Sequence, residues 1–266
     1  MDHLIWIGSL WVVMAAIGAL GLPISQFVFS ASSDRGYSFS KILSLFAVGY
    51  LTFLIATLGL APLAFPAIAT ALLAWAAINA FVFWRTRAHR LPLPRFSQIL
   101  TTELVFLSVC TAIVIIKAFH PEIYQIERFM DFGFIETLRN STGLPLTDLW
   151  LAGETLNYYY MSHFIGFVIL TLAGIPSVPG FFILIGCIAG TLAAAIARLA
   201  IDVAVYITGG KEVLSRTTKF LVAGGSVFVA VFSGSWYMIP WIVQRIGFLF
   251  GVGQMPDFFY PEPTRA

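Results

Sequence analysis

This chain contains seven apolar segments, most of them long enough to span a membrane. A helix needs about 20 apolar residues to cross the hydrocarbon core of a bilayer. The segments cover residues 4–29, 42–61, 64–84, 99–118, 158–175, 180–207 and 220–243. They are apolar on all sides, whereas the strands of a membrane β-barrel alternate. Because backbone groups must be satisfied inside the bilayer, the sequence predicts an all-α, polytopic transmembrane helix bundle.

The composition supports a membrane protein. Hydrophobic residues make up 59% of the chain and charged residues only 11%, whereas a soluble domain carries about 25% charged residues. Cys110 and Cys187 both fall inside apolar segments, which argues against a disulfide framework and a cysteine-based metal site. We also expect Pro23 to kink the first segment, because proline removes a backbone donor.

The distribution of Lys and Arg predicts which segments cross. The short loop at 85–98 is basic and is assigned to the cytoplasm, which puts the long loop at 119–157 on the outer face of the plasma membrane. If residues 158–175 do not cross, ten of the 15 Lys and Arg lie inside, and if they cross, eight do. The positive-inside rule favours the first arrangement. We therefore expect six spans plus one juxtamembrane helix on the outer face, with seven spans as the alternative.

The outer loop carries an unusual number of acids for a simple connection. Two of them, Asp131 and Asp148, are candidates for chemistry. Asp131 follows the fourth apolar segment closely and lies near the depth of a lipid headgroup, although an exposed interfacial acid would occupy the same position. Asp148 follows Pro145 and can equally form an Asx-turn. The six acids of the loop are Glu122, Glu127, Asp131, Glu136, Asp148 and Glu154.

A cluster of hydroxyl-bearing rings follows the loop in the sequence LNYYYMSHF. The tyrosines Tyr158, Tyr159 and Tyr160 begin an apolar segment, with Asn157 before them and His163 three residues after the last. An aromatic belt at the membrane interface accounts for the tyrosines, and an interfacial hydrogen bond accounts for His163. The alternative is that these residues form the rim of a binding site.

The same stretch resembles the "YYY" family of hydrophobic membrane proteins. ERFMDFGF, LPLTDLWLAG and LNYYYMSH match, in order, the family patterns E-K-P-M-D-F, P-P-x-D-P-W-x-x-G and N-Y-Y-Y-x-G-H. The match covers about 40 contiguous residues, and YPEPTR near the end resembles the family's W-x-x-T-R stretch. Arg128 and Phe129, Leu149 and Ser162 depart from the pattern.

This family is in turn similar to the GT-C class of membrane glycosyltransferases, which use sugars on polyprenyl phosphate carriers. The resemblance implies transfer of such a sugar to an unidentified acceptor on the outer face, with Asp131 as the catalytic base. Membrane lipid and the lipid-linked sugar are the expected partners, and no nucleic acid is expected. No cofactor is implied with certainty. The residues expected to bind phosphate are Arg128, Arg139 and His163; Asp148 and Glu154 are expected to bind sugar hydroxyls or a divalent cation; Asn157 and the three tyrosines are expected to contact substrate.

Two other classes of protein remain open. A transporter would carry ionisable residues deep in several spans, and a non-enzymatic membrane protein would need only the hydrophobic segments. We expect residues 1–98 to form an N-terminal three-helix membrane region and residues 99–266 a GT-C-like module. Because the family pattern continues beyond its T-R stretch, we expect the module to be incomplete at its C-terminus.

Overall fold

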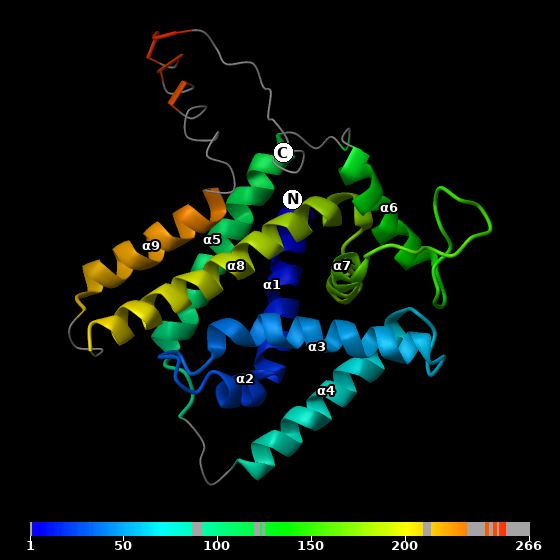
Figure 1. Cartoon of the computed structure of the whole chain (residues 1–266), viewed down its shortest axis with the longest axis horizontal. Coiled ribbons are helices and arrows are strands. Elements are labelled where there is room, and N and C mark those ends of the chain that lie inside the picture. Colours follow the sequence, from blue (N-terminus) through cyan, green and yellow to red (C-terminus); the bar gives the residue numbers. More distant parts are fainter. Residues whose placement is uncertain are drawn as a thin grey trace. The chain divides into compact units, whose positions relative to one another are not determined.

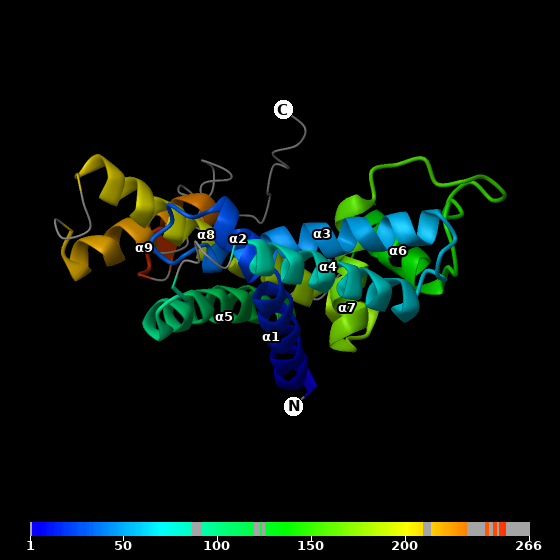
Figure 2. The same cartoon turned by 90° about the horizontal axis from the view of Figure 1, so that it is seen from below.

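The chain folds into α-helices. The computed structural model describes residues 2–86, 92–119, 123, 126–209, 214–232, 243–244, 247–248 and 250–253, and no strand is present within them apart from one isolated bridge. Figures 1 and 2 show the helices from two sides. In chain order they are α1 (Asp2–Leu20), α2 (Leu22–Val28), α3 (Tyr37–Thr57), α4 (Phe65–Arg85), α5 (Phe96–Ala118), α6 (Ile126–Asn140), α7 (Met161–Ala173), α8 (Ser177–Ile207) and α9 (Arg216–Phe232). The all-helical prediction is confirmed.

Four of the described helices, α3, α4, α5 and α8, are long and apolar enough to cross a membrane. The pair α1 and α2 makes a fifth if it is one broken span, bent by 59°. Helix α7, in the segment expected to lie flat, has 13 residues, fewer than the roughly 20 that a span needs. The last expected span, 220–243, continues past α9 into residues outside the described ranges, as does the YPEPTR stretch.

The break between α1 and α2 has a clear chemical cause. Pro23 stands in the first turn of α2, as expected for a kink. Gly21 precedes it, and a Cβ at this position would collide with the Ser44 hydroxyl of α3. The Asn79 side chain of α4 accepts a hydrogen bond from the Ile24 amide at 3.2 Å. A side-chain oxygen therefore satisfies a donor at the start of α2, so the broken helix can be buried.

The chain forms two compact units, Met1–Ala195 and Ile196–Ala266. The boundary falls within α8, so the division expected after residue 98 does not coincide with it and stays a prediction. The second unit holds the end of α8 and, among its described residues, α9. In it Arg198 Nε lies 3.5 Å from Asp202 Oδ1, one helical turn along α8. This is the local pairing that a spacing of four residues favours.

Helix α7 lies in the core of the first unit, where two small residues let its neighbours approach. A Cβ at Gly49 of α3 would lie 2.8 Å from Ile165 of α7, and one at Gly166 of α7 would lie 2.9 Å from Leu184 of α8. Phe164, Phe167 and Leu170 are almost fully buried. Glycine at a helix interface is typical of close packing in membrane proteins. The packing fixes the position of the first turn of α7, which carries His163.

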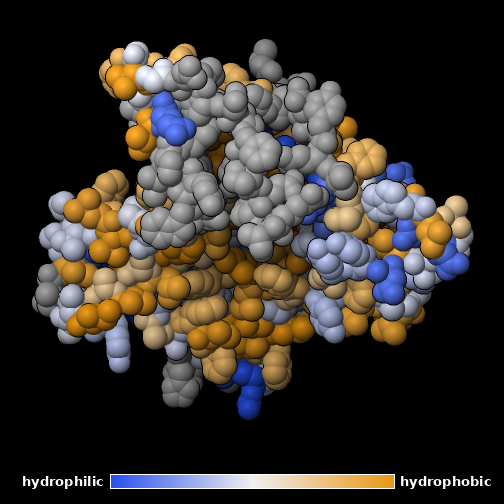
Figure 3. Space-filling model, turned by 45° about the horizontal axis from the view of Figure 1, so that its top comes forward, coloured by the Kyte–Doolittle hydropathy of each residue, from blue (hydrophilic) through white to orange (hydrophobic). Residues whose placement is uncertain are grey.

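The surface divides by polarity. Many large hydrophobic side chains are exposed on the long helices, including Leu73 of α4 and Ile188 of α8. Figure 3 shows a broad hydrophobic surface, with hydrophilic residues gathered at the side where α6 and the loop after it lie. Such exposed apolar area suits contact with lipid. The candidate site lies at the hydrophilic side of the first unit.

Candidate functional site

Helix α6 directs two of its charged residues, Arg128 and Asp131, to a cavity. Arg128, Asp131 and Ile135 recur at spacings of three and four residues, so they lie on one side of the helix. All three line a single cavity. Phe134 and Leu138 lie four apart and are buried in the core. The amphipathic pattern of α6 therefore anchors the helix through its apolar residues and directs Arg128 and Asp131 to the cavity.

Asp131 meets His163 across the interface between α6 and α7. His163 Nε2 lies 2.8 Å from Asp131 Oδ1. The His163 side chain is 14% exposed and the Asp131 side chain 36%. Because an ionised carboxylate only accepts hydrogen bonds, Nε2 donates whenever Asp131 is ionised. Among the described residues, Asp131 Oδ2 has no hydrogen-bond partner. His163 thus fixes Asp131 Oδ1, and Asp131 Oδ2 remains available to accept a proton or a hydrogen bond.

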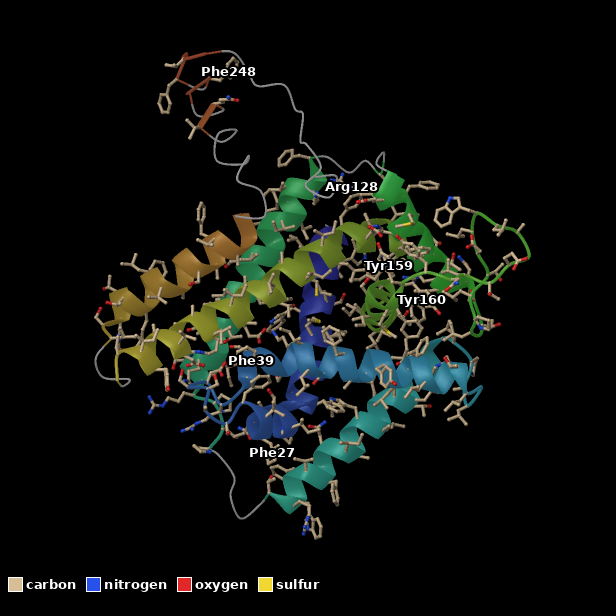
Figure 4. All side chains as sticks on the ribbon, viewed as in Figure 1. Phe27, Phe39, Arg128, Tyr159, Tyr160 and Phe248 are labelled. Carbon is tan, nitrogen blue, oxygen red and sulfur yellow. The ribbon has the colours of Figure 1, made fainter. Side chains whose placement is uncertain are left out.

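The Asp131–His163 pair stands at the polar end of a cavity of about 770 Å³. Arg128, Tyr159 and Ser162 line the same end, because they neighbour the pair in α6 and at the start of α7. Figure 4 shows Arg128 near the first turn of α6 and Tyr159 beside the start of α7. The remaining walls come from α3, α7 and α8, with one residue of α6, and are mostly apolar: Ile42, Leu45, Phe46, Ile135, Ile165, Gly166, Ile169, Phe181, Leu184, Ile185, Cys187, Ile188, Thr191 and Leu192.

Phe134 holds the rings around the site together. Its side chain is 1% exposed. Its ring packs edge-on against Trp150 at 5.9 Å and against His163 at 5.1 Å, and it lies tilted against Tyr158 at 5.6 Å. Edge-to-face contacts at these distances are favourable because of the ring quadrupole. One buried ring therefore orients the histidine, the first tyrosine and the loop tryptophan at once.

The three tyrosines have different environments. Tyr158 and Tyr159 stack with ring centroids 4.1 Å apart, and the Tyr158 hydroxyl donates to that of Tyr159 at 2.8 Å. This hydrogen bond is the main reason that the pKa of Tyr158 is raised, because ionisation would remove the donated proton. Tyr160 is turned into the core instead, and burial raises its pKa. Only Tyr159 lines the cavity.

The segment that carries Asp148 folds as a small hairpin against α6. Leu156 N donates to Leu146 O at 2.8 Å, and Asp148 N donates to Glu154 O at 2.9 Å. Asp148 Oδ1 accepts hydrogen bonds from the amides of Trp150 at 2.7 Å and Leu151 at 3.0 Å. These hydrogen bonds form an Asx-turn, which is one of the two interpretations that the sequence allows for Asp148.

The hairpin docks at a glycine of α6. A Cβ at Gly133 would lie 2.7 Å from Leu149 Cδ1, so the tip of the hairpin packs directly on the helix backbone. Glu154 and Asn157 are exposed, Asp148 is half-buried, and none of the three lines the cavity. Their contacts with sugar stay a prediction.

Arg139 also lies away from the cavity. It stands at the end of α6, where its Nη1 donates to the carbonyl of Ile175 at 2.8 Å, in the turn between α7 and α8. Of the expected phosphate ligands, the structure therefore brings only Arg128 and His163 together at the cavity.

The residues present do not favour a metal site. In the described ranges, no three His, Cys, Asp or Glu side chains gather as a metal ion would require. Asp131 and His163 form a pair, and Asp148 Oδ1 already accepts two amide hydrogen bonds.

Sequence reasoning missed a second acid–base pair, buried between α3 and α5. Lys41 Nζ donates to both oxygens of Glu103, at 2.7 and 2.6 Å. Tyr37 and Trp11 donate to the same carboxylate at 2.6 and 2.8 Å, and Lys41 also lies 4.6 Å from the Phe106 ring centroid. The signal was present: two opposite charges stand at the ends of two apolar segments assigned to the same side of the membrane.

Comparison with known proteins identifies the family and nothing finer. No curated protein and no solved structure matches the chain. Residues 47–265 match the model of a family described as "Uncharacterized membrane protein (DUF2298)", and this range includes α6, α7 and every cavity residue outside the first turns of α3. Since the match spans well over half of the sequence, the chain belongs to this family of membrane proteins, DUF2298.

Proposed function

We propose that this protein is an integral-membrane glycosyltransferase that moves a sugar from a polyprenyl-phosphate carrier to an acceptor hydroxyl. One observation carries the proposal: a half-engaged carboxylate stands with an arginine at the polar end of a cavity with otherwise apolar walls. Such a cavity suits a substrate with a charged head and a hydrocarbon chain. The resemblance to the "YYY" and GT-C proteins points in the same direction.

The proposed reaction uses these groups in the following way. The acceptor oxygen forms a bond to the anomeric carbon of the sugar, and the bond between that carbon and the phosphate oxygen breaks. The bonding electrons leave with the phosphate, and the proton of the acceptor hydroxyl goes to Asp131 Oδ2. A positioned base of this kind contributes roughly 10²–10⁴-fold to a rate. His163 orients the carboxylate through Oδ1 and is a positioning residue.

Arg128 is the candidate phosphate ligand. It is partly buried, lines the cavity and stands one turn before Asp131 on α6. A guanidinium matches the geometry of phosphate oxygens and stays charged at any physiological pH. Placed there, Arg128 stabilises the charge that develops on the leaving phosphate while Asp131 receives the proton.

We place the site on the outer face of the plasma membrane, as the Lys and Arg distribution favours. Cysteines introduced at 140 and 215, for labelling with a membrane-impermeant maleimide in intact cells, test this placement. Labelling at 140 alone is expected. Labelling at 215 alone, or at both positions, would contradict it.

The competing function is transport, and the buried pair Lys41–Glu103 is the observation that favours it, because ionisable residues inside spans mark ion and proton pathways. Neither residue lines the cavity. Glu103 accepts four hydrogen bonds from Trp11, Tyr37 and Lys41. A carboxylate that accepts four hydrogen bonds from two other helices is held in place, which suits a structural role better than ion transport.

The test is consumption of lipid-linked sugar by the full chain in membranes. Polyprenyl phosphates carrying radiolabelled glucose or mannose are supplied, and loss of label from the lipid fraction is followed. Asp131→Asn keeps the shape and removes the base, so the rate is expected to fall roughly 10²–10⁴-fold. Glu136→Gln, on the same helix, is the matched control and keeps the wild-type rate. An Asp131→Asn protein as fast as wild type would exclude the proposed mechanism.

A further inference from the structure

Tyr158 and Tyr159 form an exposed aromatic pair on the first unit. The Tyr159 ring is 75% exposed although one part of it lines the cavity beside Asp131. Trp150 is 55% exposed, and both Trp150 and Tyr158 rest on Phe134. Leaving large rings in contact with water forgoes the free energy of burying them. The pair is also rigid, because stacking and the hydroxyl hydrogen bond fix it.

Carboxylates flank this aromatic pair. Glu127 and Asp131 are four residues apart on α6, so they lie on the same face of that helix. Both lie close enough to the Tyr158 hydroxyl for their charge to add to the rise in its pKa. Arg128, between them in sequence, supplies the cationic donors at the same end of the cavity. The Tyr158 hydroxyl thus stands near two groups that accept hydrogen bonds, and Tyr159 shares the cavity with one of them, Asp131.

This combination discriminates between ligands. The two carboxylates repel phosphate and other anions, which disfavours an acidic lipid headgroup on the ring face itself. They accept hydrogen bonds from hydroxyl groups, and the ring offers an apolar face to C–H groups. A neutral saccharide has both parts: hydroxyl groups at its edge and a C–H face that stacks on an aromatic ring.

We propose that Tyr158 and Tyr159, together with Glu127, bind a neutral saccharide and that this saccharide is the acceptor of the proposed transfer. The inference rests on the proposed function, because it assigns the second substrate of the same site. A pyranose stacked on Tyr159 directs one hydroxyl to Asp131 Oδ2, since Tyr159 and Asp131 share the cavity end. The lipid phosphate then approaches from the Arg128 side, and the two substrates meet at the base.

Binding is tested on the full chain in nanodiscs of phosphatidylcholine, by saturation-transfer difference NMR. The probes are maltose, cellobiose and α-1,2-mannobiose. At least one is expected to bind, and Tyr159→Leu is expected to weaken that binding several-fold, up to roughly tenfold, which is the range of an aromatic contact. Tyr159→Phe keeps the ring and most of the binding. Tyr206→Leu, at a tyrosine of α8 that is 86% exposed, is the matched control.

An aromatic belt at the membrane interface is the outcome that would overturn this inference. In that case brominated lipids quench the Trp150 contribution to fluorescence, measured as the part lost in Trp150→Phe, and no disaccharide binds. Saccharide binding that is equal in Tyr159→Leu and wild type would overturn it as well.

A transfer assay separates this inference from the proposed function. Tyr159→Leu is expected to raise KM for the acceptor with little change in kcat, because stacking is lost equally from bound substrate and transition state. Asp131→Asn is expected to lose transfer and keep saccharide binding. Transfer with an unchanged KM in Tyr159→Leu contradicts the acceptor site alone. Saccharide binding without transfer by the wild type contradicts the glycosyltransferase alone.

Discussion

The two acid–base pairs of the first unit differ in how completely their carboxylates are engaged. Glu103 is 6% exposed and accepts four hydrogen bonds, two on each oxygen, from Lys41, Tyr37 and Trp11. Asp131 is partly exposed, accepts one hydrogen bond from His163 and faces a cavity. Both pairs join separate helices. A saturated, buried carboxylate joins α1, α3 and α5, whereas an unsaturated one beside a cavity is available for a proton.

The largest expected effect is a loss of unfolding free energy when the Lys41–Glu103 pair is broken. Glu103→Leu leaves the Lys41 ammonium buried without its partner, which costs about 3–5 kcal/mol of unfolding free energy. The double variant Lys41→Met with Glu103→Leu is expected to recover part of that loss, since the charge is gone while Tyr37 and Trp11 still lack their acceptor. Thermal unfolding of the detergent-solubilised chain measures both. If Glu103→Leu is as stable as wild type, the Lys41–Glu103 pair does not stabilise the fold.

The second prediction concerns rate rather than stability. His163→Phe removes the hydrogen bond to Asp131 Oδ1 and keeps a ring against Phe134, and a hydrogen bond to a charged group is worth about 1.5–3 kcal/mol. If it is fully expressed in the transition state, sugar transfer slows roughly 10- to 150-fold. Combined with Asp131→Asn, His163→Phe is expected to add almost nothing, because the two act as a unit. Initial rates of the four proteins test this, and additive losses would show that His163 acts independently of Asp131.

The third prediction compares how the two regions respond to an added methyl group. In Gly190→Ala of α8 the new Cβ would lie 2.5 Å from the backbone carbonyl oxygen of Phe106, close to the Lys41–Glu103 pair. The backbone has to move, at a cost of about 1–3 kcal/mol. In Gly133→Ala, near Asp131, the new atom meets the flexible end of Leu149, and the change is expected to stay within about 1 kcal/mol. Melting temperatures of Gly190→Ala and Gly133→Ala measure the difference. Equal shifts would show that the two regions accommodate an added methyl group equally well.

The smallest expected effect is on the tyrosine pair. Tyr159→Phe removes the acceptor of the Tyr158 hydroxyl and is expected to lower the pKa of Tyr158 towards its ordinary value of about 10. In the native protein the hydrogen bond is present below that ordinary value and is lost as pH rises through the raised pKa. Alkaline titration followed by NMR of ¹³C-labelled tyrosine measures the shift, with Tyr206→Phe as the control. An unmoved Tyr158 signal would mean that the hydroxyl bond does not hold the pair.

Some placements in the site follow from local sequence. Asp131 follows the fourth apolar segment by 13 residues, so the sequence alone predicts that it lies outside that span. The Asx-turn at Asp148 is equally local, because its acceptor and donors are two and three residues apart. Partners far apart in the chain could not be read in this way. Asp131 and His163 are separated by 32 residues, and Lys41 and Glu103 by 62.

Sequence alone was enough to predict that this chain folds in a membrane, that it bends at Pro23, and that the segment containing α7 is short. Such features depend on the transfer of a dozen or more neighbouring residues from water into the membrane. The hydropathy of a contiguous stretch of sequence is enough to predict that transfer. The tertiary structure alone decided that His163, and not Arg139 or Asp148, meets Asp131. That choice depends on how closely α7 packs between α3 and α8 at Gly49 and Gly166, because the absence of two side chains sets the depth and rotation of the helix that carries the histidine.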